Sequence, residues 1–355
     1  MYSTARKLQS RMLSRCAGKR AGRFAPHVFP IDSLPVDPDP SFDLEHFQGL
    51  GMKLFPKVVF SVDCQSIDEE LVKKAIRITS QLECELTILD SIHELSWLTK
   101  LTLPNHESIT ELVERDKNNS IQEMVDRFCR SGIPTTGELM HGPTSSNVVD
   151  FCEAQGTDLI LRVTRGAQSN EPGRLGRTSK RLLRKSPCPI WLMHPHTRPL
   201  SENVVACIDT EENSEEDFQF ADRILETAKY VGSKGHGLVS IVHAWNLWNE
   251  KMVKHRISES EFETWKLDCR ESEAERLNQF LSRHEKSCED HDVFLVEGDP
   301  SIAIPEFVKD VSADVVVMGT VGRSGFTGML VGNTAERIFE RVPCDVLALK
   351  PKLSE

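Results

Sequence analysis

The chain has 355 residues, with 43 Lys and Arg against 54 Asp and Glu, which gives a formal net charge of −11. Binding to a phosphate backbone needs a basic face, so this balance argues against a general nucleic-acid binder, and no apolar run approaches the length of a membrane span. With 39% hydrophobic and 27% charged residues, the composition is typical of a soluble globular protein long enough for two domains.

Residues 1–51 differ in composition from the rest of the chain. No acidic residue precedes Asp32, while Arg and Lys recur there, and several prolines then break any helix before residue 51. An Arg-rich, acid-free start resembles an organelle transit peptide. We favour a disordered tail, or an upstream start ahead of Met52, because no apolar segment follows the charges as a secretion signal requires.

The first half after this tail alternates short apolar runs with stretches of helical periodicity. The predicted strands are 58–63, 86–89, a weaker one ending near residue 140, 158–163 and 189–193. The predicted helices are 67–82, 105–131, one that begins at 141–146 and runs through 152, and 175–185.

The second half has the same order of elements. The predicted strands are 204–209, 237–245, 293–298, 315–318 and 345–349, and the predicted helices are 214–231, 259–286, 299–311 and one that begins after Gly332 and stops at Pro343. Strands that alternate with helices in this way indicate a parallel α/β sheet.

A shift of 156 positions aligns the ends of the two halves without a gap. The matched pairs are Gly142 with Gly298, Asp158 with Asp314, Thr164 with Thr320, Gly166 with Gly322, Gly176 with Gly332, Arg181 with Arg337, Pro187 with Pro343 and Cys188 with Cys344. We interpret the chain as a tandem duplication with a boundary near Arg198 and Pro199, so that the domains are 52–198 and 199–355.

The most informative stretch is the glycine-rich loop between the strand at 315–318 and the last helix. Its glycines are Gly319, Gly322, Gly325, Gly328 and Gly332. Glycines let the backbone approach an anion closely, and the start of a helix adds unpaired N–H groups and a positive dipole end. Asn333 and Thr334 can add side-chain donors, and Arg323 a cation. No Gly-Lys-Ser/Thr follows, and the spacing differs from the dinucleotide fingerprint. The alternative is a tight loop that binds no ligand.

The spacing Gly319, Gly322, Gly332 resembles the nucleotide motif of the universal stress protein family, and GTVGRSG followed by GNTAER is most similar to its tandem, E-type bacterial members. The resemblance implies two tandem doubly wound domains, each a five-stranded parallel sheet in the order 3-2-1-4-5. It implies intramolecular pairing of the domains through their last strands. A higher oligomer is left open.

The resemblance also implies a ligand, which is ATP or a related adenine nucleotide with Mg²⁺ at the phosphates. Asp209 and approximately Ala244 match the positions that family members place near ribose and adenine. Asn333 departs from the family pattern, in which a serine often follows the third glycine, although Asn can still donate to phosphate. The alternative for Asp209 is a helix N-cap or a turn aspartate.

The first domain departs further from this motif. It keeps Asp63, and Gly166 and Gly176 keep their spacing, but Val163 stands where the first glycine belongs. A β-branched residue there obstructs close approach, and the loop that follows adds Glu171 and Pro172. We therefore predict that this domain has lost ordinary nucleotide binding.

No catalytic constellation is visible, so the expected role is regulatory rather than enzymatic, with unknown protein partners, in stress survival. Two alternatives stay open: a slow ATPase or other nucleotide-dependent enzyme, and a ligand-free interaction scaffold. The ten cysteines form no C-x-x-C pair and are typical of reduced thiols in a cytoplasmic protein. The helix at 259–286 is expected to be a solvated face, and the dispersed histidines are expected to be satisfied or exposed: His194, His196, His236, His243 and His291.

Overall fold

The computed structural model describes residues 53–92, 106–164, 175–195, 202–210, 215–320 and 331–351. The predicted tail, residues 1–51, lies outside the described residues. Within these ranges, no helix combines the length and the apolar composition that crossing a membrane requires.

The N-terminal half contains five strands and four helices in the described ranges. The strands are β1 (Lys57–Ser61), β2 (Glu85–Ile92), β3 (Thr135–His141), β4 (Leu159–Val163) and β5 (Ile190–Met193), and the helices are α3 (Glu69–Leu82), α5 (His106–Arg130), α6 (Thr144–Gln155) and α7 (Arg177–Lys185). β2 is longer than the predicted strand 86–89. Its end contains Asp90 and Ser91, polar residues that are nevertheless buried, and they interrupt the apolar run that the prediction followed.

The C-terminal half contains the matching elements and one additional short helix. The strands are β6 (Asn203–Cys207), β7 (Leu238–Trp245), β8 (Val293–Glu297), β9 (Val315–Gly319) and β10 (Asp345–Leu349), and the helices are α8 (Glu215–Gly235), α9 (Glu250–Lys254), α10 (Glu259–Leu281), the 3₁₀ turn η1 (Ser282–His284), α11 (Pro300–Asp310) and α12 (Asn333–Arg341). A capping box between Ser258 and Glu261 starts α10. The predicted helix 259–286 is α-helical only to Leu281, where the chain tightens into η1, and Glu285, with φ 55°, ends that turn.

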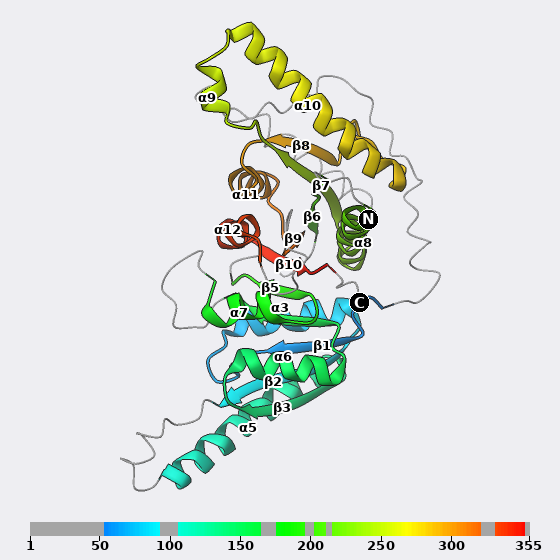
Figure 1. Ribbon diagram of the computed structural model, residues 1–355. Helices are drawn as coiled ribbons and strands as arrows, with labels where there is room; N and C mark the ends of the chain where they lie inside the picture. Colours follow the sequence, from blue (N-terminus) through cyan, green and yellow to red (C-terminus); the bar gives the residue numbers. More distant parts are fainter. Residues whose placement is uncertain are drawn as a thin grey trace.

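All ten strands form one sheet in the order β3-β2-β1-β4-β5-β10-β9-β6-β7-β8. Each half has the order 3-2-1-4-5, as predicted, and the strands within each half run parallel. The strand order of each half therefore reverses between its first and fourth strands, which are β1 and β4 in one half and β6 and β9 in the other (Figure 1). In sheets of this type, that reversal is where ligands bind.

The two halves join edge to edge through β5 and β10, the only antiparallel pair among the strand pairs of the described sheet. Leu347 lies opposite Trp191 in this pair. Pairing of the last strands covers two edges that would otherwise be open. The predicted intramolecular contact between the last strands is confirmed.

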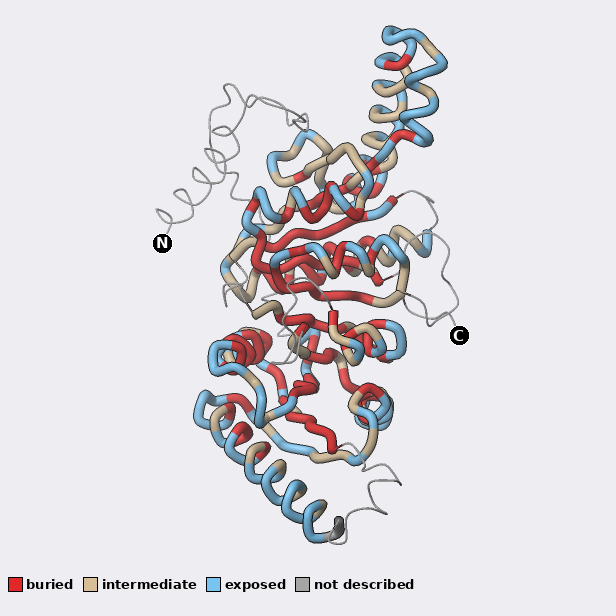
Figure 2. Tube along the Cα trace, turned by 90° about the vertical axis from the view of Figure 1, so that its left-hand side faces the viewer, coloured by how far each residue is buried: buried red, intermediate tan, exposed pale blue. Residues whose placement is uncertain are grey.

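Helices cover both faces of the sheet, and the burial follows from the alternation of side chains along each strand. One apolar cluster packs α3, α5, α8 and α10 against the sheet, and the other packs α6, α7, α11 and α12 against the opposite face. The buried strands run through the centre of the molecule in Figure 2, with exposed helix surfaces outside them. Cys188 and Cys344 are buried in the second cluster, and the described cysteines are free thiols.

Candidate functional site

The carboxyl ends of β6, β7 and β9 lie side by side in the second domain. β6 pairs with β7 on one side and with β9 on the other. Asp209 follows β6 and is exposed, Ala244 lies near the end of β7, and Gly319 ends β9. The structure thus brings three of the predicted residues to the reversal point. Their roles toward a ligand stay predictions.

A backbone hydrogen bond closes the base of the glycine loop. The Gly332 N–H donates to the Thr320 carbonyl at 2.9 Å, and the Thr320 N–H donates to the Leu349 carbonyl at 2.8 Å. The loop between them includes Gly322 and Arg323, which lie outside the described residues. In the first domain, Gly176 donates to the Thr164 carbonyl at 3.2 Å, so the base of the loop is duplicated even though its sequence is not.

Helix α12 begins directly after this closure. Its N-cap is Gly332, with φ −61° and ψ 143°, and no side chain caps the first turn. Asn333 and Thr334 are exposed there. The first N–H groups of a helix have no partner within it and carry the positive end of its dipole, so this end can accept an anion.

Two buried threonine hydroxyls lie at the ends of the adjacent strands. Thr210, after β6, and Thr320, after β9, are 0% and 1% exposed, and neither hydroxyl has a hydrogen-bond partner among the described residues. A buried polar group without a partner is costly, so these hydroxyls can take a hydrogen-bond partner from a ligand. The matching Thr164 of the first domain is also buried with an unpartnered hydroxyl, so Thr210 is the one of the two that has no such counterpart in the first domain among the described residues. The one signal for them in the sequence is the match of Thr320 with Thr164 at the repeat offset.

Next to Ile208, which precedes Asp209, lies a contact between buried His243 and partly buried Glu273 that the sequence analysis missed. His243 of β7 makes two contacts, one from Nδ1 to the Ile208 carbonyl at 2.9 Å and one from Nε2 to a Glu273 carboxylate oxygen at 3.4 Å. The hydrogen bond with His243, together with Arg276, lowers the pKa of Glu273 to about 2. His243 is therefore a satisfied core residue, as expected, but α10 is not purely a solvated face.

The first domain places a cation at the same point. Lys117 of α5 donates to Asp63 at 2.7 Å and to Asp90 at 2.9 Å. Asp90 also accepts the Cys64 N–H at 3.1 Å. Burial is the largest single influence and opposes ionisation of Asp63, but the hydrogen bonds from Lys117, Ser66 and Gln65 and the charge of Lys117 together outweigh it and lower the pKa of the carboxyl. The aspartate that matches Asp209 is thus already bound by a side chain of its own domain.

A second cation stands between β1 and β4. Arg162 donates to the Ser61 carbonyl at 3.0 Å and to the Ser61 hydroxyl at 2.7 Å, and burial lowers the pKa of its guanidinium to about 10. At the repeat offset, its counterpart in the second domain is Met318. Val163, which follows Arg162, packs against the core. Glu171 and Pro172 lie outside the described residues.

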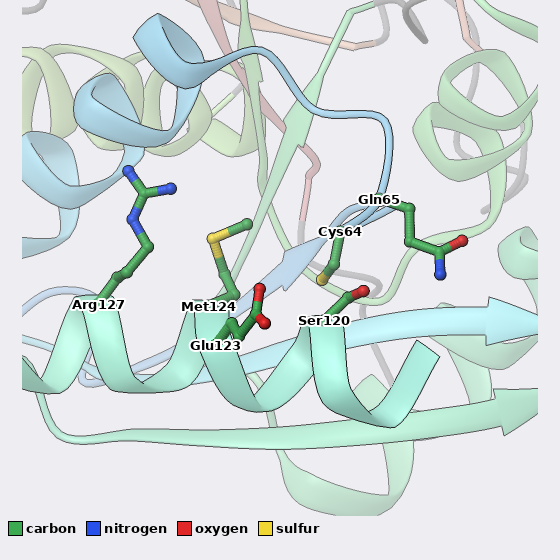
Figure 3. A pocket seen from close by; sticks show the side chains of 6 residues that line it. All are labelled: Cys64, Gln65, Ser120, Glu123, Met124 and Arg127. Atoms are coloured by element: carbon green, nitrogen blue, oxygen red, sulfur yellow. The ribbon is translucent and has the colours of Figure 1, made fainter. Parts of the chain in front are cut away.

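A shallow cavity of about 440 Å³ lies beside these charges in the first domain. It opens between the loop after β1 and helix α5 (Figure 3). Burial raises the pKa of the Cys64 thiol to about 12, so this wall offers no reactive thiolate. None of the predicted site residues lines this cavity, whose walls are Cys64, Gln65, Ser120, Glu123, Met124 and Arg127.

Comparison with known proteins matches each half of the chain to one family. The model of the universal stress protein family matches residues 55–194 and 201–350. The chain is 23% identical over 308 residues to universal stress protein E of Escherichia coli K12, covering 84% of this chain and 95% of that relative. It is 21% identical over 305 residues to a universal stress protein E homolog of Haemophilus influenzae, covering 84% of this chain and 98% of the relative.

Solved structures share the tandem fold. A functionally unknown protein of Pseudomonas aeruginosa superposes with a TM-score of 0.59 at 20% identity, covering 85% of this chain and 94% of that chain. A universal stress protein of Archaeoglobus fulgidus gives a TM-score of 0.58 at 20% identity, covering 84% and 99%. At this identity, the likeness concerns the fold.

Proposed function

The chain belongs to the universal stress protein family, and from that premise we propose that it is a regulatory protein of the stress response whose second domain binds ATP or a related adenine nucleotide. The observation that carries the proposal is the duplicated closure at Gly332 and Thr320. This closure places the start of α12, which no side chain caps, close to the buried hydroxyls of Thr210 and Thr320 and to Asp209.

Each group at this edge can take one part of the nucleotide. The first N–H groups of α12 and the side chains of Asn333 and Thr334 donate to phosphate oxygens. Asp209 accepts from ribose or base donors, and the backbone near Ala244 lies against adenine. Gly319, Gly322 and Arg323 complete the phosphate loop in this proposal. Mg²⁺ accompanies the phosphates and neutralises part of their charge.

The first domain is proposed not to bind nucleotide in the same way. Lys117 occupies the carboxylate of Asp63, and Arg162 and Val163 stand at the reversal point. The stoichiometry is therefore one nucleotide per chain. Its output is a change in shape or in a partner surface, because no general base accompanies the loop among the described residues. We place this action in the cytoplasm, where free cysteines stay reduced.

The test is calorimetric titration of the protein with ATP, with and without Mg²⁺, on Gly332→Val and Gly176→Val variants. Both glycines cap a helix with extended backbone, with φ −61° and −62°, which a residue with a side chain can also adopt, and a Cβ at Gly176 would meet the Thr164 carbonyl only at 3.7 Å. We expect one site per chain, lost in Gly332→Val and kept in Gly176→Val. Two sites, or loss only in Gly176→Val, would contradict the assignment. Saturable ATP hydrolysis that Asp209→Ala abolishes would favour a nucleotide-dependent enzyme. No binding of ATP at all would favour a ligand-free interaction scaffold.

A further inference from the structure

His243 faces two groups that can only accept hydrogen bonds. Nδ1 lies 2.9 Å from the Ile208 carbonyl oxygen, and Nε2 lies 3.4 Å from the Glu273 carboxylate. A neutral imidazole has one N–H and one lone pair, whereas an imidazolium has two N–H groups. Only the imidazolium donates to both partners. The neutral ring would turn a lone pair toward either the carbonyl or the carboxylate.

The carbonyl that His243 holds belongs to the peptide bond of Asp209. This peptide is trans, as are all the described peptide bonds, and it is planar, so fixing the Ile208 carbonyl also fixes the direction of the Asp209 N–H. The Ile208 N–H still donates to the Val242 carbonyl at 2.9 Å. His243 therefore sets the direction in which the chain leaves β6 and presents Asp209.

The other charged groups around the ring are those of the elements packed against β7. Helix α10 contributes Glu273, which binds Arg276, and one turn earlier Cys269 and Arg270. β8 places the apolar Leu295 in register with His243. The carboxylates of α8 nearest to α10 bind elsewhere, Glu215 to Arg283 and Asp222 to His284. The ring itself is 3% exposed, so Glu273 is the charge that directly faces it.

We propose that His243 is a positioning residue for the second-domain site, held as an imidazolium by Glu273, and that ligand binding there weakens as rising pH removes the ring proton. The part that concerns ligand binding rests on the proposed function. The sign follows from the geometry. The protonated ring makes both contacts at low pH. When the ring loses a proton, the remaining N–H stays on Nε2, where it faces the charged carboxylate of Glu273. Nδ1 then turns a lone pair toward the Ile208 carbonyl, which loosens the peptide of Asp209.

The first measurement is an NMR titration of the protein with ¹⁵N-labelled histidine and backbone, from about pH 5.5 to about pH 9, which brackets the usual histidine range. His243→Gln assigns the ring signal. We expect the Asp209 amide to follow the ring titration. Glu273→Gln should move both titrations to lower pH, and Glu271→Gln, which changes an exposed carboxylate two residues away, should move neither. An Asp209 amide that ignores the ring titration overturns the proposal whether or not a nucleotide binds.

The second measurement is ATP affinity across the same pH range. We expect the dissociation constant to rise at least about fivefold through the ring titration, the lower end of a typical coupling between two sites, and to do so at lower pH in Glu273→Gln. Clear binding with constant affinity overturns the coupling to the ligand. If ATP binds at no pH while the amide follows the ring, the proposed function fails and the positioning role of His243 stands.

Discussion

At two matching positions, the basic and the acidic residue have exchanged places between the two domains. Glu273 lies at the repeat offset from Lys117, and His243 follows β7 residue Val242 as Asp90 follows Leu89 of β2. Asp90 accepts a backbone N–H beside Asp63, whereas His243 donates to a backbone carbonyl beside Asp209. In the first domain Lys117 binds both Asp90 and the strand-ending Asp63, whereas in the second domain His243 contacts Glu273. This exchange of basic and acidic residues distinguishes the two domains at the strand ends where their ligand sites are expected.

Lys117→Met removes the cation while keeping most of its apolar stem. Asp90 is 3% exposed, so the variant leaves a buried carboxylate without its cation, and breaking such a pair costs about 3 kcal/mol of unfolding free energy. Half-exposed Asp63 adds little because water screens it. Urea unfolding at neutral pH measures the difference.

The pH dependence provides a check on this interpretation. The folded-state pKa of Asp63 is lowered, so its stabilisation is present above its unfolded pKa and disappears as the pH falls through the folded value. The small part of the difference in unfolding free energy that Asp63 contributes should therefore disappear in acid. Lys73→Met, which removes an exposed pair with Glu70 on α3, is the control and should change the unfolding free energy little. An equal loss of unfolding free energy in Lys117→Met and Lys73→Met would contradict the stabilising role of the Lys117–Asp90 pair.

At the scale of elements, periodicity predicted the strands and helices, the repeat predicted the two domains, and the family resemblance implied the strand order. None of these signals could predict that Lys117 binds Asp63 and Asp90 or that Glu273 contacts His243, because each contact joins a helix to a strand or strand end far away in the sequence. Lys117 and Glu273 are related by the repeat offset, but Asp90 and His243 are not, because the segment between Asp90 and Lys117 differs in length from the segment between His243 and Glu273. Glu273 also looked like one more charge on a solvated helix.

Helices α7 and α12 form an interface between the domains in which equivalent positions carry different charges. Lys180 and Arg184 of α7 contact Glu336 and Glu340 of α12, and each cation sits at the repeat offset from one of these carboxylates. In a symmetric pair of identical domains, such equivalent positions would carry like charges. Within one chain, they have diverged to opposite charges.

Glu336→Lys should destabilise this contact. The hydrogen bond from Lys180 lowers the pKa of Glu336, so the carboxylate is ionised at neutral pH and its stabilisation is lost only in acid. Since the side chains are 24% to 51% exposed, the loss should be about 1 kcal/mol. Unfolding at low and high salt measures it, and the loss should shrink with salt. Lys180→Glu with Glu336→Lys should recover stability, and no recovery would argue against the ion pair.

For the whole molecule, the seam between β5 and β10 contains one buried carboxylate that ties the domains together. Asp345 of β10 is 1% exposed and accepts from the Trp191 indole N–H at 3.0 Å and the His194 N–H at 2.8 Å. It also binds Lys74 of α3 at 2.5 Å. One residue of the second domain thus holds a strand, a loop and a helix of the first, and the two domains should unfold together.

Asp345→Ala should break this link. It leaves Lys74 buried without its carboxylate, which costs about 3 kcal/mol or more, and it weakens the seam so that one unfolding transition becomes two. The chain has five tryptophans, so the part of the fluorescence change that a Trp191→Phe variant loses reports on the seam, and circular dichroism reports on the whole fold. Glu340→Gln removes a partly exposed contact with Lys180 between helices α12 and α7 of the two domains, and this variant should keep a single transition. Adding Lys74→Met should return much of the stability, because no unpaired charge then remains buried. A single transition at unchanged denaturant in Asp345→Ala would mean that strand pairing alone couples the domains.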